Sequence, residues 1–220
     1  MSINLYIVRH GETYINKYDR VQGWTNAPLT LKGINDSEQA GKRLANLVFN
    51  NVYSSDLARA VETANIILTH NDSTAELQTL PDFREVFFGY FDGISNDVAA
   101  SAIAKDRKLP AGITFNEISD TMSPFTLMDA IHDVDPTGDA ESAATFWQRL
   151  MHGFTTIAKE NNDGDNVLLI AHGQLLSILG QQFAQLTASQ SEPKNGAVNL
   201  WQLTDNHLEL KVFNDLTTFW

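Results

Sequence analysis

The 220-residue sequence contains no cysteine. Without cysteine, the chain can form no disulfide, bind no metal through thiolates and use no cysteine nucleophile. The absence also fits a protein of a reducing compartment, where disulfides are rare.

Long apolar runs are missing too, although 43% of the residues are hydrophobic. No run approaches the roughly 20 residues that a membrane-spanning helix needs. The apolar stretch before Arg9 is too short for the core of a signal peptide, and no basic leader precedes it. We therefore expect a cytoplasmic protein that has no membrane partner.

Positive charge is also scarce. The chain has 15 lysines and arginines against 27 acidic residues, which gives a net charge of −12. A general nucleic-acid-binding protein needs a basic face, so we expect no nucleic acid partner. If the substrate is an anion, a few cations focused in a cleft must attract it.

The sequence does contain an alternation of strand and helix patterns. Continuous apolar runs at residues 5–8 and 167–171 are typical of strands buried on both faces, and a shorter strand is expected around Val52 and Tyr53. Apolar residues at helical spacing predict helices over residues 31–48, 57–68, 141–161 and 175–183.

Polar residues indicate where two of these helices begin and where a hairpin turn lies. Thr30 and Asp56 are suitable N-caps for the first two helices, because their side-chain oxygens can accept from free backbone N–H groups. Near the end of the chain, residues 198–203 and 208–213 flank Asp205-Asn206, which is typical of a hairpin turn.

Strands that alternate with helices predict an α/β fold, here a three-layer α/β/α sandwich around a mainly parallel sheet. The C-terminal hairpin should add antiparallel strands at one edge. Between Ile94 and Gly138, prolines and glycines interrupt the pattern. We expect an insertion of irregular helices and loops there, at about residues 94–138, over the active-site edge of the sheet. No linker or repeat divides the chain, so residues 1–220 should form a single domain.

Two of the apolar strands end in the same way. The first runs into His10-Gly11 and the second into His172-Gly173. In open α/β sheets, ligands bind outside the carboxyl ends of the strands, so both histidines should lie at the functional edge. One such histidine alone would be read as a solvated loop residue. Two strand-His-Gly segments in one parallel sheet favour a site.

Arg59 is a third candidate for this site. It is expected in the first turn of its helix, close to the end of the preceding strand and away from the apolar face. A surface ion pair with Glu62 or Asp56 is the alternative, but such a pair stabilises little. The functional interpretation is a planar guanidinium aimed at phosphate beside that of Arg9.

Four ordered blocks of the sequence resemble the histidine phosphatase superfamily, in the branch of cofactor-dependent phosphoglycerate mutase and its bacterial phosphatase relatives. The resemblance covers about residues 4–93 and 138–183. An Arg-His-Gly tripeptide alone would be weak evidence, whereas four blocks in the family's order are specific. The blocks are Arg9-His10-Gly11-Glu12-Thr13, the Gln22-Gly23-Trp24 to Pro28-Leu29-Thr30 stretch with Lys32-Gly33, Ser54 to Ala64, and Ala171-His172-Gly173.

The resemblance implies roles for individual residues. His10 matches the nucleophile, and Glu85, just before the Phe87-Phe88-Gly89 segment, matches the proton donor. Glu62, Glu76 and Asp92 are nearby alternatives for the acid, and an ion pair with Arg84 is the structural alternative for Glu85. The residues that the resemblance places around the substrate are Arg9, Asn16, Gln22, Gly23, Arg59 and His172.

The chemistry of these residue types supports the same roles. A histidine nucleophile must attack as neutral imidazole, and flanking arginines lower its pKa. Fixed arginine and histidine donors can stabilise a transferring phosphoryl group without a metal, so we expect no metal and no cofactor. A protonated glutamate can supply the proton that an alkoxide leaving group needs.

The leading hypothesis is therefore a metal-independent phosphatase that releases phosphate from a small phosphorylated metabolite. A cofactor-dependent phosphoglycerate mutase is the alternative within the family. Against it, the 94–138 segment holds few basic residues for a second phosphate, namely Lys105, Arg107, Lys108 and His132. A catalytically silent phosphometabolite-binding protein is a third hypothesis, and a metal-dependent phosphoesterase would need a ligand cluster that we do not find.

Overall fold

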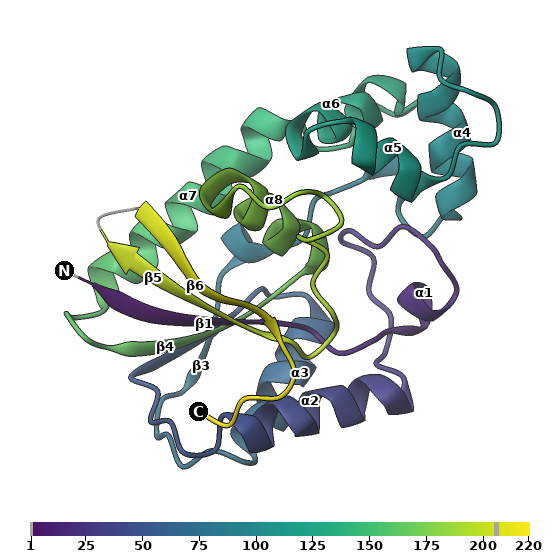
Figure 1. Ribbon diagram of the computed structural model, residues 1–220. Coiled ribbons are helices and arrows are strands. Elements are labelled where there is room, and N and C mark those ends of the chain that lie inside the picture. Colours follow the sequence, from purple (N-terminus) through teal and green to yellow (C-terminus); the bar gives the residue numbers. More distant parts are fainter. Residues whose placement is uncertain (1, 205–206) are drawn as a thin grey trace.

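The structure is a computed structural model and describes residues 2–204 and 207–220. One six-stranded sheet forms its centre, in the order β3-β2-β4-β1-β5-β6 (Figure 1). The first four are parallel to their neighbours, whereas β5 runs antiparallel to β1 and β6 antiparallel to β5. The strands are β1 (Ile3–Arg9), β2 (Asn51–Ser54), β3 (Leu77–Thr79), β4 (Asn166–Ala171), β5 (Val198–Thr204) and β6 (His207–Asp215).

This arrangement confirms the predicted α/β fold with a mainly parallel sheet and antiparallel strands at one edge. The predicted hairpin turn, Asp205-Asn206, lies outside the described residues. The edge strand β3 was not predicted, because its three residues are largely exposed and carry no apolar alternation.

Helices cover both faces of the sheet, and alternation along the strands explains why. Side chains of β1 point alternately to either face, so Tyr6 and Val8 pack in one apolar cluster while Leu5 and Ile7 pack in the other. The first cluster includes residues of α2 (Leu31–Arg43) and α3 (Ala58–Leu68), and the second includes residues of α7 (Ala143–Glu160) and α8 (Gly173–Ala184). Short elements complete this part of the chain: α1 (Tyr14–Lys17) and the 3₁₀ turns Pro81–Phe83 and Gly89–Phe91.

Two local expectations were wrong. The helix after Thr30 ends at Arg43 rather than at residue 48, and Val48 is 65% exposed, so it does not belong to the buried face. Asp56 does not cap α3, since Leu57 occupies that position without a side-chain bond. The Asp56 carboxylate instead pairs with Arg84. Thr30 does accept from the backbone N–H of Gly33, as an N-cap should.

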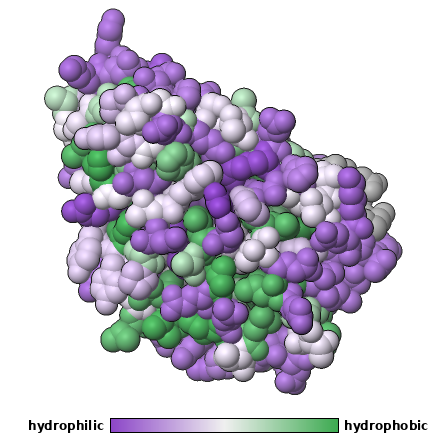
Figure 2. Space-filling model, turned by 180° about the vertical axis from the view of Figure 1, so that it is seen from behind, coloured by the Kyte–Doolittle hydropathy of each residue, from purple (hydrophilic) through white to green (hydrophobic). Residues whose placement is uncertain are grey.

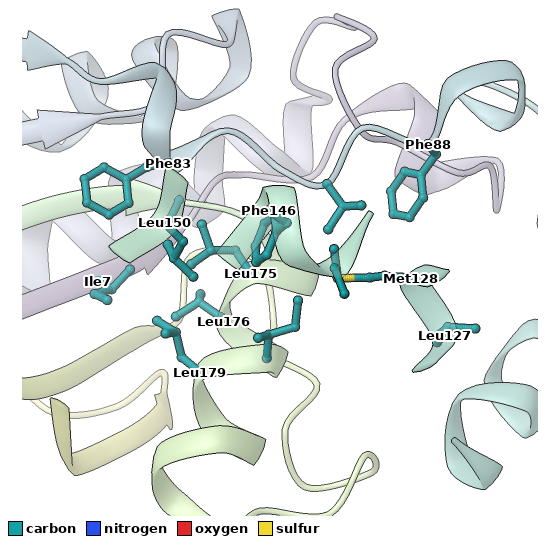
Figure 3. Packing of buried hydrophobic residues seen from close by; sticks show 14 of the residues in the cluster. Ile7, Phe83, Phe88, Leu127, Met128, Phe146, Leu150, Leu175, Leu176 and Leu179 are labelled. Carbon is teal, nitrogen blue, oxygen red and sulfur yellow. The ribbon is translucent and has the colours of Figure 1, made fainter. Parts of the chain in front are cut away.

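The segment expected to be irregular holds three capped helices, which lie together at the upper right of Figure 1. Ser95, Thr114 and Ser123 cap them. Their apolar residues share a cluster with α7 and α8, and Figure 3 shows Leu127 and Met128 in the group that contains Phe146 and Leu175. The helices are α4 (Asn96–Arg107), α5 (Phe115–Thr121) and α6 (Pro124–Val134).

The outer surface of this insertion is mostly hydrophilic or intermediate, at the upper left of Figure 2, where the molecule is seen from behind. More apolar residues gather lower on the same face. Within residues 2–204 and 207–220, no helix combines the length and the apolarity that crossing a bilayer requires.

Candidate active site

The two histidines lie side by side at the carboxyl ends of neighbouring strands. Arg9, the last residue of β1, pairs in register with Ala171, the last residue of β4. His10 and His172 therefore leave the sheet together, and their ring centroids are 5.1 Å apart. Both rings are buried, with 3% and 0% of their surface exposed. The parallel register alone brings together residues that are far apart in the sequence.

The His10 ring is held as a neutral imidazole with Nε2 free of a proton. Its Nδ1–H donates to the carbonyl of Gly11 at 2.8 Å, and Nε2 accepts from Nε of Arg59 at 3.1 Å. Burial lowers the pKa of His10 well below its usual range, and the charges of Arg59 and Arg9 lower it further. The lone pair of Nε2 is thus present at neutral pH, as a nucleophile requires.

Arg59 is a buried cation between the two histidines. The first turn of α3 places its side chain, 1% exposed, under the loop that carries Gly23 and Thr25. It donates to the carbonyls of Gly23 at 2.7 Å and Thr25 at 3.2 Å, and Nη2 also lies 3.1 Å from Nδ1 of His172. Burial lowers its pKa to about 10, so it stays charged at neutral pH.

The structural alternative for Arg59, an ion pair with Asp56 or Glu62, is not what the structure shows. Asp56 pairs with Arg84, and Glu62 is exposed on the outside of α3. Arg84 also lies over the Trp24 ring, 4.5 Å from its centroid, so Arg84 is not the partner of Glu85 either. Neither carboxylate therefore neutralises the charge of Arg59, which remains available to an anion bound beside His10.

Ser55 orients the ring of His172 and was not predicted as a site residue. Its hydroxyl lies 2.6 Å from Nε2 of His172, while Nδ1 faces Arg59. Because Nδ1 accepts from the guanidinium, the Nε2–H donates to Ser55. Burial, and then the charge of Arg59, hold the pKa of His172 well below its usual range. The position of Ser55 directly after β2, beside β4 in the sheet, is the signal that could have identified it.

Arg9 brings a second guanidinium to the same edge. Its Nη1 donates to the carbonyl of Pro193 at 2.5 Å, and among the described residues nothing accepts from its buried Nε. A side chain at Gly173 would press on this guanidinium, since a Cβ there would lie 3.1 Å from Cζ of Arg9. Any other residue after His172 would thus have to push this guanidinium aside by a few tenths of an ångström. Burial lowers the pKa of Arg9, and Glu85 and Glu192 oppose that effect.

Glu85 lies at the N-terminus of α8, in the same cavity as His10. Its Oε2 accepts from the backbone N–H of Gln174 at 2.8 Å, and Oε1 accepts from those of Leu175 and Val86 at 3.1 Å. Burial raises the pKa of Glu85, although these N–H groups and the arginines act in the opposite direction. A carboxyl group with a raised pKa can hold a proton for a leaving group.

The other acids considered for this role lie elsewhere. Glu62 and Glu76 are exposed. The carboxylate of Asp92 accepts from the backbone N–H groups of Gly23 at 2.7 Å and Trp24 at 3.1 Å, which ties down the loop that holds Arg59. The structure therefore brings only Glu85, of the four candidates, to the cavity beside His10.

The ion pair of Arg149 and Glu141 holds the backbone of the segment that carries Glu85. Nη2 of Arg149 donates to the carbonyl of Glu85 at 2.9 Å, and Nη1 donates to those of Asp82 and Arg84. Nε of Arg149 pairs at 2.7 Å with Glu141, whose backbone N–H donates to the carbonyl of Phe87. Sequence reasoning missed this clamp, because the bonds run to backbone carbonyls, which no side-chain pattern reveals.

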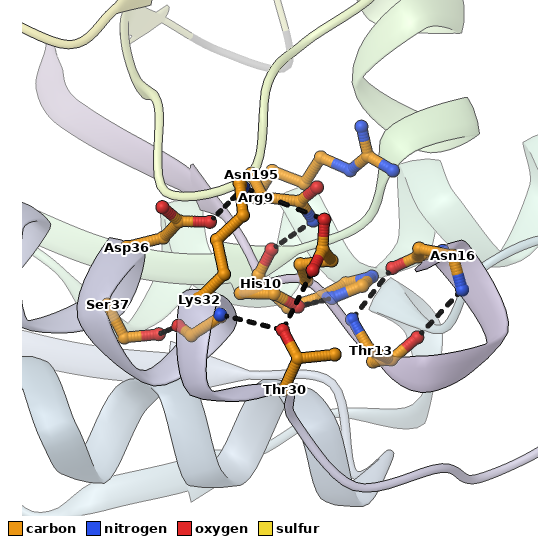
Figure 4. A network of polar contacts seen from close by, with 12 residues as sticks. Arg9, His10, Thr13, Asn16, Thr30, Lys32, Asp36, Ser37 and Asn195 are labelled. Carbon is orange, nitrogen blue, oxygen red and sulfur yellow. Dashed lines mark hydrogen bonds and ion pairs between the residues drawn. The ribbon is translucent and has the colours of Figure 1, made fainter. Parts of the chain in front are cut away.

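A cavity of about 560 Å³ opens beside His10. Asn16 and Gln22 line it together with Arg9 and Glu85. Figure 4 shows Asn16 beside Thr13 on the α1 side of His10, where its amide oxygen accepts from the Thr13 backbone N–H at 3.2 Å.

Two predicted substrate contacts are engaged by the protein itself. The side-chain oxygen of Gln22 accepts from the hydroxyl of Thr13 at 2.6 Å. Gly23 does not line the cavity, because its N–H donates to Asp92 and its carbonyl accepts from Arg59. Gly23 can therefore influence a bound ligand through its hydrogen bond to Arg59, and not by direct contact. Over the described ranges, no three His, Asp or Glu side chains are arranged to hold a metal ion.

The sequence profile of the histidine phosphatase superfamily (branch 1) matches residues 5–126 and 108–216 of the chain. The chain belongs to the histidine phosphatase superfamily. Known members of this superfamily include both phosphatases and mutases, which supports an enzyme of the phosphatase type.

Three similar proteins illustrate this range. The fructose-2,6-bisphosphatase TIGAR B of Danio rerio is 30% identical over 189 residues, which are 81% of this chain and 73% of the relative. The probable phosphoglycerate mutase GpmB of Salmonella choleraesuis is 45% identical over 132 residues, 54% of this chain and 59% of the relative. The crystal structure of phosphoglycerate mutase from Bacillus anthracis superposes on this structure with a TM-score of 0.88 at 30% identity. The match covers 98% of this chain and 94% of the mutase.

Proposed function

We propose that the chain is a metal-independent phosphatase of the cytoplasm, which hydrolyses small phosphorylated metabolites through a phosphohistidine on His10. The observation that carries this proposal is the neutral, buried ring of His10, with its Nε2 facing Arg59 in a cavity shared with Glu85. A nucleophile, a cation for the phosphoryl oxygens and an acid for the leaving group are the parts that this reaction needs.

In the first step, the Nε2 lone pair of His10 attacks phosphorus, and the bond from phosphorus to the ester oxygen breaks. The proton of Glu85 passes to that oxygen, so the substrate leaves as an alcohol. Arg59 turns its Nε–H from His10 to a phosphoryl oxygen as the nitrogen is phosphorylated. Arg9, whose Nε has no partner among the described residues, and His172 stabilise the same oxygens.

In the second step, the Glu85 carboxylate takes a proton from a water molecule, whose oxygen attacks the phosphohistidine. The bond between Nε2 and phosphorus breaks, phosphate leaves, and His10 and the protonated Glu85 are restored. The N–H groups of Gln174 and Leu175 stabilise the Glu85 carboxylate between the two steps.

A phosphoglycerate mutase is the second candidate, favoured by the likeness to the Bacillus anthracis mutase. A mutase of this kind must hold a bisphosphorylated ligand. However, none of Lys105, Arg107 and Lys108 lines the cavity, and Arg107 pairs with Asp106 and Asp133. The insertion instead contributes the carboxylate of Asp120 to the cavity. This lining favours hydrolysis over transfer back to the substrate.

Assays of phosphate release from a panel of phosphomonoesters, run beside a mutase assay primed with 2,3-bisphosphoglycerate, test the proposal. We expect release of inorganic phosphate to be faster than interconversion of 2- and 3-phosphoglycerate. Faster interconversion would establish the mutase. Binding of phosphomonoesters without turnover in either assay would establish a catalytically silent binding protein.

A further inference from the structure

The cavity beside His10 is much larger than a phosphoryl group, and its size lies within the range of about 300–1,000 Å³ typical of small-molecule sites. Arg9, His10 and Glu85 form its phosphate end. The rest of the lining comes from residues 12–22, from Phe88, from the start of α4, from α5, from α8 and from residues 188–195. In the proposed reaction, the part of the substrate that leaves as the alcohol extends from the phosphate end toward the wall of α4, α5 and α8.

Four uncharged polar side chains of this wall have no side-chain partner within the described part of the protein. They are Asn96, Asn116, Ser119 and Gln174, and each can both donate and accept a hydrogen bond. Such groups are matched by a ligand that also donates and accepts. An ammonium group donates only, so it would leave the donors of these amides unpaired.

Charged side chains outside the phosphate end of the cavity are mostly negative. Asp120 of α5 and Asp19 line this part of the cavity, Glu192 lies close enough to Arg9 to act on its charge, and Glu12 pairs with Lys32. Arg20 is the one cation there in the described residues apart from Arg9. Arg20 donates to the carbonyl of Gly93 at 2.8 Å. A second anionic group on the substrate would therefore meet repulsion from Asp19 and Asp120.

We infer that the substrate is the phosphomonoester of an uncharged, hydroxyl-rich compound, such as a polyol or a sugar. Hydroxyl groups donate to the wall carboxylates and exchange hydrogen bonds with the amides of Asn96 and Asn116 and the hydroxyl of Ser119. Phe88 and Phe115, which also line the cavity, offer apolar faces to the C–H groups of the same carbon chain. This inference rests on the proposed phosphatase activity and adds the substrate class.

Matched substrates for the unmodified enzyme isolate each feature. Sorbitol 6-phosphate, 6-phosphogluconate and hexyl phosphate share a six-carbon chain, but the second carries a carboxylate and the third lacks hydroxyls. We expect kcat/KM to be highest for sorbitol 6-phosphate, by about tenfold or more over each of the others. Glucose 6-phosphate should likewise be preferred over glucosamine 6-phosphate, which carries an amine in place of one hydroxyl.

Variants of the α5 wall test the assignment to these residues. We expect Asn116→Ala and Ser119→Ala each to reduce the preference for sorbitol 6-phosphate over hexyl phosphate severalfold. Asp120→Asn should raise kcat/KM for 6-phosphogluconate relative to sorbitol 6-phosphate, because one repulsive charge is removed. Asn65→Ala, at an exposed position of α3 outside the cavity lining, is the matched control and should leave every ratio unchanged.

The outcomes separate this inference from the proposed function. Release of phosphate with hexyl phosphate, 6-phosphogluconate or glucosamine 6-phosphate as the better substrate would overturn the substrate class and leave the phosphatase in place. No release from any compound would overturn the phosphatase and the inference with it. Unchanged ratios of kcat/KM between the substrates in the α5 variants would show that this wall does not bind the leaving group, and would overturn the assignment.

Discussion

Nε of Arg59 donates to Nε2 of His10 across 3.1 Å, and this contact settles which nitrogen of the ring is free to react. A ring nitrogen that accepts a hydrogen bond from a guanidinium carries no proton. The proton therefore resides on Nδ1, which donates to Gly11. The arginine that we propose as the partner of the phosphoryl group thus also keeps the proposed nucleophile neutral.

His10→Ala should abolish turnover while the fold and some affinity for phosphate remain, because the arginines are untouched. Brief incubation of the unmodified enzyme with substrate, followed by a quench without acid, should reveal acid-labile phosphate on His10. The control is His70→Ala, at a half-buried histidine outside the cavity, which should retain activity. Substantial activity in purified His10→Ala would rule out the covalent mechanism.

Activity should persist in excess chelator, because Arg9, Arg59 and His172 supply the positive charge that a metal ion provides in other phosphoesterases. The measurement is the rate of phosphate release after extensive dialysis against chelator, compared with an undialysed sample. Loss of activity that a divalent ion restores would contradict this prediction.

Glu85→Gln should impair the first step only where the leaving oxygen needs a proton. General-acid help is worth about 10²–10⁴-fold, so single-turnover cleavage of an alkyl phosphate should lose most of that factor. p-Nitrophenolate leaves readily without a proton, so the pre-steady-state burst of p-nitrophenol should stay close to that of the unmodified enzyme. Equal losses on both substrates would instead give Glu85 a binding or structural role.

The pH dependence of kcat/KM should be bell-shaped, with an acidic limb set by His10 and a basic limb set by Glu85. His10 must be neutral, and since its pKa lies well below 6.5, its protonation reduces activity only at low pH. Glu85 must be protonated for the first step, so activity on an alkyl phosphate should fall as the pH rises through its pKa, which lies above the ordinary 4.5. Glu85→Gln should lack this fall. Ionisation of the substrate affects both enzymes alike, so the difference between their profiles isolates Glu85.

Arg149 is expected to act as a positioning residue for Glu85. Arg149→Lys keeps the charge but has only three N–H donors, so it cannot bind the three carbonyls and the Glu141 carboxylate together, and the Glu85 segment should shift. A shift of about 1 Å can cost up to about 100-fold, and we expect a loss of this order on an alkyl phosphate. The p-nitrophenol burst should change far less. A purely structural role would instead reduce both rates equally, in proportion to the loss of folded protein.

Much of this fold could be predicted from local patterns in the sequence. The strands that end at His10 and His172 are runs of apolar residues, and a parallel sheet has one edge at which such strands end. That rule is enough to expect both histidines together, although paired residues of β1 and β4, such as Asn4 and Asn166, are 162 positions apart in the sequence. Thr30 was recognisable as an N-cap for a similar reason, because its partner is three residues away.

The surroundings of the candidate catalytic groups depended on contacts that no local pattern records. The sequence offered the adjacent Glu85 as a partner for Arg84, and only the packing of the chain brought Asp56, 28 positions away, to it instead. Arg149 reaches Glu85 through a backbone carbonyl, which every residue possesses, so its role leaves no mark on the sequence. Local spacing therefore determines which residues reach the edge of the sheet, whereas burial and long-range hydrogen bonds, which exist only in the folded chain, decide their protonation and their partners.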